Sequence, residues 1–164
     1  MRARLRSALL FSLLLSGFAA AGCGGPAVDL EQGLQLEVVS TGWFDAGIID
    51  GKNKLVPALI IKLKNVSDQN LVTLQINAIF HRVGDAQEWG TGFITAAGSR
   101  GLQPGSVTSP LTVKSHLGYT GTEPRADMLG NSRFVDARVD VFAKYGSTQW
   151  TKIGETLISR QLLT

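Results

Sequence analysis

The segment Val72-Thr73-Leu74-Gln75-Ile76-Asn77-Ala78-Ile79-Phe80-His81 decides the fold class of this chain. Every second side chain from Val72 to Phe80 is apolar, and all but one of the intervening side chains are polar. Successive side chains of a β-strand point to opposite faces of a sheet. This two-residue period therefore predicts a strand with one buried face, and a β-protein around it.

The preceding apolar segment, residues 55–64, has the same character. Leu59, Ile61 and Leu63 fall on one predicted face, and the polar connection 65–70 is rich in turn-forming residues. The two segments are thus expected to form an antiparallel pair or a crossover between sheets. Pro57 has no backbone N–H to donate, so it is expected near the start of its strand or on a sheet edge.

Further outward, short alternating segments recur between glycine and proline turns. About seven strands and no long helix predict an all-β fold, an antiparallel β-sandwich, with a small barrel as the alternative. Gly154 breaks the last pattern and predicts a bulge. The aperiodic loop 115–132 is expected to contain one helical turn at 125–129. The remaining predicted strands span residues 34–39, 88–96, 107–114, 134–145 and 149–160.

The N-terminus has the layout of a secretory signal peptide. Arg2, Arg4 and Arg6 precede an apolar run over residues 8–21 that ends in small side chains. A stable transmembrane helix needs about 20 apolar residues, so this run is too short for a good permanent anchor. We therefore expect a signal peptide at 1–22, a lipidated tether at 23–33 and the β-sandwich domain at 34–164.

The end of that run, Ala20-Ala21-Gly22-Cys23, resembles the lipobox of bacterial lipoproteins. The resemblance implies cleavage between Gly22 and Cys23 and fatty acids, such as palmitate, on Cys23, so that the membrane is bound through this lipid. Cys23 is the single cysteine, so no disulfide is expected. Gly24 is not the aspartate that retains lipoproteins at the inner membrane in enteric-type sorting. This favours the outer membrane, with the domain facing the periplasm.

The charge balance depends on the signal peptide. The chain has 16 basic and 13 acidic residues, and three of the basic ones are Arg2, Arg4 and Arg6. The mature chain is therefore formally neutral. A neutral domain gives no support for nucleic-acid binding, which calls for a basic patch.

Residues with catalytic or metal-binding chemistry are sparse. His81 and His116 are far apart in the sequence, and the polar side of the predicted strand makes His81 a solvated surface residue. No Gly-x-Ser-x-Gly motif accompanies Ser115-His116. We expect no catalytic residue, no metal and no cofactor. The mixed charges of Asp136, Arg138, Asp140 and Lys144 predict cross-strand ion pairs on a solvated face.

The aromatic residues are the remaining candidates for a site. Trp89 and Trp150 fall within strand patterns and are expected to be buried or half-buried. Trp43, Phe44 and Tyr119 fall in predicted connections. Exposed aromatic side chains in loops mark contact sites, so these three are the candidate binding surface for a protein or a sugar.

Two resemblances concern the domain itself. The run 59–67, the strand ending at Phe80 and the segment Leu102-Gln103-Pro104-Gly105 resemble small Ig-like sandwich lipoproteins of the bacterial envelope. This resemblance implies an Ig-like sandwich. Residues 56–61 and 141–145, with Trp150, are similar to core strands of the transthyretin-like lipoprotein of type VI secretion systems.

These observations favour a lipid-anchored envelope protein with a non-enzymatic binding or structural role, and an envelope protein as its partner. Two alternatives stay open. One is an outer-membrane lipoprotein subunit of a type VI-like secretion apparatus. The other is an enzyme with an unrecognised site in the loop 115–132, since long loops in compact domains are often functional.

Overall fold

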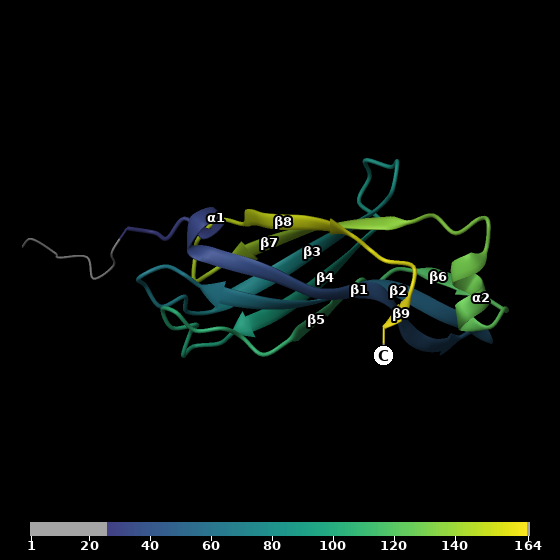
Figure 1. Ribbon diagram of the computed structural model, residues 1–164, viewed down its shortest axis with the longest axis horizontal. Helices are drawn as coiled ribbons and strands as arrows, with labels where there is room; N and C mark the ends of the chain where they lie inside the picture. The colour runs from purple at the N-terminus through teal and green to yellow at the C-terminus, as the bar shows by residue number, and fades with distance from the viewer. Residues whose placement is uncertain (1–25, 164) are drawn as a thin grey trace, which may run out of the picture.

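Two sheets pack face to face in the computed structural model, which describes residues 26–163 (Figure 1). The all-β prediction is confirmed. Residues 26–163 form nine strands instead of about seven, and these make two separate sheets instead of a closed barrel. The predicted signal peptide 1–22 and the predicted cleavage and lipidation site at Gly22 and Cys23 lie outside the described residues.

The elements follow one another in a simple order. The strands are β1 (Leu34–Ile49), β2 (Lys52–Asn65), β3 (Leu74–Arg82), β4 (Gly90–Ala97), β5 (Leu111–Lys114), β6 (Tyr119–Gly121), β7 (Ala137–Lys144), β8 (Thr151–Leu157) and β9 (Leu162–Leu163). The helices are α1 (Leu30–Gly33) and α2 (Arg125–Gly130). The helical turn predicted at 125–129 is therefore confirmed as α2.

The first sheet has the order β5-β2-β1-β9, with β6 also paired to β2, and the second has the order β4-β3-β7-β8. All pairs are antiparallel except β1 with β9. The segment that alternates most clearly becomes β3, a central strand of the second sheet. Strands β4 and β7 flank it on both sides, and its inward side chains point toward the first sheet. These side chains are fully buried, as the pattern predicted: Leu74, Ile76, Ala78 and Phe80.

Strand β1 differs from its sequence pattern. A register shift between Val38 and Ser40 interrupts the alternation of inward and outward side chains. Val38 and Val39 are therefore both exposed. The strand then continues to Ile49. Trp43 and Phe44 therefore lie within a strand, and the loop predicted for them is wrong.

Pro57 is neither at a strand start nor on a sheet edge, so that prediction is wrong. It lies in the middle of β2, opposite Trp43 of β1. On its other side the partner changes from β6 to β5, and the Pro57 carbonyl accepts the N–H of Ser115. The N–H that proline lacks would point into this break, so no ladder hydrogen bond is lost.

The bulge predicted near Gly154 is confirmed. Val141 pairs with Gly154 but Phe142 pairs with Lys152, so Ile153 is an extra residue in β8. Gly154 lies against the other sheet, where an added Cβ would come 2.7 Å from the Leu36 side chain. The glycine therefore allows β1 and β8 to approach each other.

The folded domain begins earlier than residue 34. Leu30 of α1 is buried in the core, the Asp29 side chain caps the helix, and the Val28 N–H donates to the Tyr145 hydroxyl at 2.6 Å. The predicted tether 23–33 is thus wrong from Val28 onward. These residues close one end of the sandwich, which we call the entry end.

Candidate functional site

An aromatic cluster closes the opposite end of the sandwich, which we call the distal end. Trp43 of β1 meets Phe134 edge to face, with ring centroids 4.4 Å apart. Tyr119 of β6 stacks near Phe134 at 4.7 Å and near Trp89 at 5.0 Å. These rings come from segments far apart in the sequence, so the cluster exists only once both sheets are assembled.

A pocket of about 230 Å³ lies beside this cluster. Its apolar part is formed by Tyr119, Phe134 and Met128 of α2. At Gly121 an added Cβ would lie 2.6 Å from a Glu123 carboxylate oxygen, so the glycine provides room for that side chain. The polar lining comes from Thr120, Glu123, Asn131 and Arg133.

The polar residues of the pocket are only weakly tied to one another. The Asn131 side-chain amide donates to Glu123 at 3.4 Å, near the limit of a hydrogen bond. Glu123 and Arg133 are exposed, and they place a carboxylate and a guanidinium on the same pocket. This arrangement can bind a small ligand that has an apolar ring and polar substituents.

The structure separates the three residues predicted as a binding surface. Tyr119 lines the pocket. Trp43 has no exposed surface (0%) and lies behind Tyr119, 5.6 Å between ring centroids, so its prediction as a surface residue is wrong. Phe44 lies on the other face of β1, where the Lys114 ammonium sits 3.8 Å from its ring. The indole N–H of Trp43 is buried and has no hydrogen-bond partner among residues 26–163.

Sequence reasoning missed most of the pocket residues. Glu123 and Arg133 belong to no periodic pattern and to no motif, and Phe134 was predicted only as the first residue of the strand 134–145. The one available signal was the length of the aperiodic loop 115–132, which supplies β6, α2 and most of the lining.

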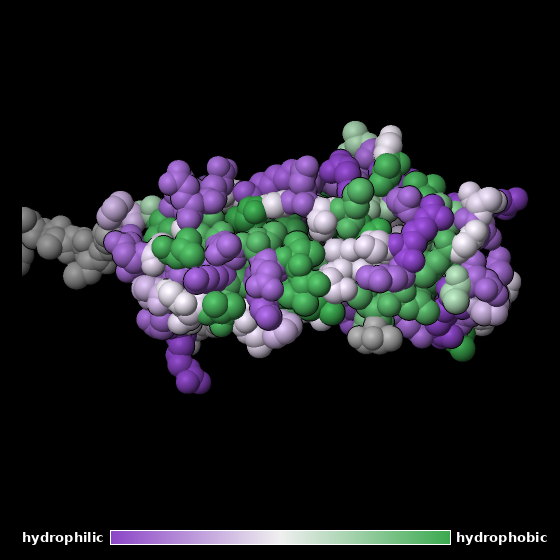
Figure 2. All heavy atoms as spheres, viewed as in Figure 1, coloured by the Kyte–Doolittle hydropathy of each residue, from purple (hydrophilic) through white to green (hydrophobic). Residues whose placement is uncertain are grey.

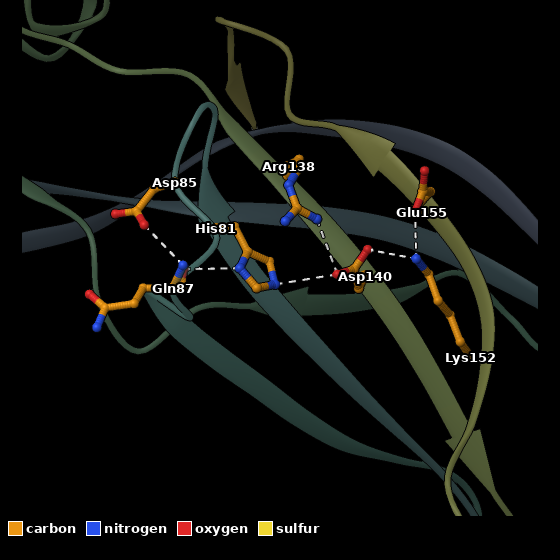
Figure 3. Close-up of polar contacts among 7 residues, drawn as sticks. All are labelled: His81, Asp85, Gln87, Arg138, Asp140, Lys152 and Glu155. Atoms are coloured by element: carbon orange, nitrogen blue, oxygen red, sulfur yellow. Dashed lines mark hydrogen bonds and ion pairs between the residues drawn. The ribbon is translucent and has the colours of Figure 1, made fainter.

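A polar network covers the outer face of the second sheet (Figure 3). One oxygen of Asp140 is 3.3 Å from His81 Nε2 and 3.1 Å from an Arg138 nitrogen, and the other oxygen is 3.0 Å from Lys152 Nζ. Burial by itself raises the pKa of the Asp140 carboxyl. The hydrogen bonds and charges of Lys152 and Arg138 lower it by more, so its pKa lies below the ordinary value of 3.8.

His81 is buried within this network, so the predicted solvated surface position is wrong. The connection after β3 folds over the ring, and His81 Nδ1 lies 3.0 Å from the Gln87 carbonyl oxygen. Both ring nitrogens thus face oxygen atoms of the protein (Figure 3). These contacts hold the ring in place, so the network orders this part of the outer face.

An exposed apolar surface lies along the side of the sandwich where β1 and β8 approach each other. Ser159 N–H donates to the Thr41 hydroxyl, which places the exposed Val38 and Val39 beside the end of β8 and its exposed Leu157. Figure 2 shows this hydrophobic surface between β8 and β1. Both strands carry a bulge here, which disfavours pairing with a further strand.

Residues 26–163 contain neither a cluster of metal-binding side chains nor a membrane-spanning helix. No three His, Cys, Asp or Glu side chains in this range come together as a metal site. No helix in the same range is long and apolar enough to cross a membrane. Comparison with protein-family models, curated proteins and solved structures gave no match to this chain.

Proposed function

We propose that this chain is a lipid-anchored protein of the bacterial envelope, facing the periplasm from the outer membrane. Its β-sandwich has a non-enzymatic binding role. The observation that carries the proposal is the position of the chain entry. Val28, where the folded domain begins, lies five residues after Cys23, so at about 3.5 Å per residue the domain starts within roughly 18 Å of the lipidated residue.

The binding role belongs to the distal pocket. The lipid would act at the entry end, whereas the pocket is lined mainly by residues of β6, α2 and the segment that follows. Both β6 and α2 lie at the other end of the molecule (Figure 1). Strand β1 runs from the entry end toward the distal end; it has 16 residues and is about 50 Å long. A ligand in the pocket is therefore well separated from the anchor.

Metabolic labelling with a fatty acid tests the anchor. The wild type is expected to incorporate label, and Cys23→Ala is expected to lose it, because the thiol is the acceptor. Ser147→Ala, at an exposed turn, is the matched control and should be labelled like the wild type. Equal labelling of Cys23→Ala would refute the anchor.

Fragment screening by NMR tests the pocket. Small compounds with an apolar ring are expected to shift the amide signals of Tyr119, Gly121 and Phe134. Arg133→Ala should weaken binding of charged fragments without loss of the fold, since Arg133 is exposed. Shifts that cluster away from these residues would argue against the pocket as the ligand site.

A further inference from the structure

An aromatic patch lies on the outer face of the second sheet, toward the entry end. Phe93 of β4 is 57% exposed and Trp150, just before β8, is 38% exposed. Their ring centroids are 6.2 Å apart although two strands separate β4 from β8, so the rings lean across the sheet toward each other. Phe142 of β7 belongs to the same face, in the row Phe93–Asn77–Phe142. We call Phe93, Phe142 and Trp150 the entry patch.

A lysine accompanies the entry patch. Lys144 Nζ lies 5.0 Å from the centroid of the Trp150 ring. Tryptophan beside lysine is typical of side chains at a membrane–water interface, where the ring lies at headgroup depth and the ammonium reaches the phosphates. The distal cluster differs, because its rings pack against one another beneath the surface.

The chain entry brings this patch close to the predicted lipid. Tyr145 follows Lys144 directly, and its hydroxyl accepts the Val28 N–H at 2.6 Å. Pro26 is held nearby, since its carbonyl accepts the Gln69 side-chain amide at 2.8 Å. The first described residues are thus attached to the end of the sheet on which Trp150 lies.

We infer that the entry patch rests on the lipid surface into which Cys23 is anchored, so that the domain holds a fixed orientation on the membrane. This inference rests on the proposed lipid anchor. An interfacial aromatic contact adds apolar area beside the acyl chains on Cys23 and restricts how the domain can tilt about them. The exposed Ile48 and Ile49 lie at the far end of β1 and stay away from the bilayer in this orientation.

Fluorescence quenching by brominated lipid tests the contact. The full-length protein, purified from membranes, is reconstituted into vesicles of phosphatidylethanolamine and phosphatidylglycerol, with or without brominated phosphatidylcholine. Brominated lipid should quench the wild type, and Trp150→Phe should lose that quenching. The remaining tryptophans are the buried Trp43 and the half-buried Trp89, both in the distal cluster.

A matched control places a tryptophan at the other end. Ile48→Trp in the Trp150→Phe background should remain unquenched. Equal quenching of this variant, or undiminished quenching in Trp150→Phe, would overturn the inference. Flotation with vesicles and the intact mass of the Cys23 peptide report the anchor separately. Protein that is acylated and floats, but whose Trp150 is unquenched, overturns the orientation and leaves the anchor standing.

Discussion

The two ends of the sandwich are closed in different ways. At the entry end, the fully buried Asn65 (0% exposed) donates its side-chain amide to the carbonyls of Gln69 at 2.8 Å and Leu102 at 2.7 Å. Its side-chain oxygen accepts the Ser67 N–H and hydroxyl. At the distal end, aromatic rings close the core, and the Trp43 indole N–H has no hydrogen-bond partner within the described part of the chain.

This difference between a hydrogen-bonded and an aromatic closure bears on the proposed position of the ligand site. A buried polar group with all its partners specifies one arrangement of the turns around it. Contacts between aromatic rings depend less strictly on direction than hydrogen bonds do. A buried N–H without a partner also lowers the free energy of unfolding. The entry end is therefore a structural closure, whereas the distal end holds the pocket to which we assign the proposed ligand.

The largest effect is expected from Trp43→Ala. Loss of the ring leaves a cavity against Phe134 and should lower the free energy of unfolding by about 4 kcal/mol. Urea unfolding of the purified protein measures it. Trp150→Ala, at a partly exposed ring, should cost less than about 1 kcal/mol. Similar costs for the two variants would show that the distal cluster does not support the core.

Asn65→Ala is next. It removes two hydrogen bonds to the Gln69 and Leu102 carbonyls and the acceptor of the Ser67 N–H, and we expect a loss of about 3 kcal/mol. Asn53→Ala is the control at the distal end, because the Asn53 amide donates to an exposed carbonyl of Glu123. It should cost less than about 1 kcal/mol. If both asparagines cost the same, the contrast between the ends fails.

A smaller effect is expected midway between the ends, at Asp140. Asp140→Asn should cost about 1.5 kcal/mol at neutral pH, discounted because Arg138 and Lys152 are more than one-third exposed. The pKa of Asp140 is lowered in the folded state, so its contribution is complete above 3.8 and is lost as the pH falls from there through the folded pKa. Unfolding curves measured across this range should show a steeper acid loss for the wild type than for Asp140→Asn. Parallel curves would contradict this role.

The smallest effects come from two tyrosine hydroxyls. Tyr145→Phe deprives the Val28 N–H of its 2.6 Å acceptor and should cost about 1 kcal/mol. Tyr119→Phe removes only a 3.4 Å contact to the Val135 carbonyl and should cost less than about 0.5 kcal/mol. Thermal unfolding of both variants compares the ends directly. A larger loss for Tyr119→Phe would mean that hydrogen bonding, too, closes the distal end.

Whether a strand prediction from the sequence succeeded depended on how far the fold pairs and buries that segment. The period of residues 72–81 predicted β3 because both of its flanks are paired and one face is buried. The same reasoning failed for Val38, since an open side and a bulge remove the burial that alternation implies. The segments Asn65–Ser67 and Leu102–Gly105 were recognisable as turn chemistry. Their mutual contact, Asn65 to the Leu102 carbonyl, was not.

The sequence by itself determined the all-β class, the bulge at Gly154, the helical turn in the loop 115–132 and the expectation of a lipid on Cys23. Each of these depends on neighbours within a few residues. Only the tertiary structure decided that Trp43 is buried, that His81 is covered and that Tyr119 and Phe134 share a pocket. These outcomes depend on contacts between strands distant in the chain, and no local period records which strand will lie opposite another.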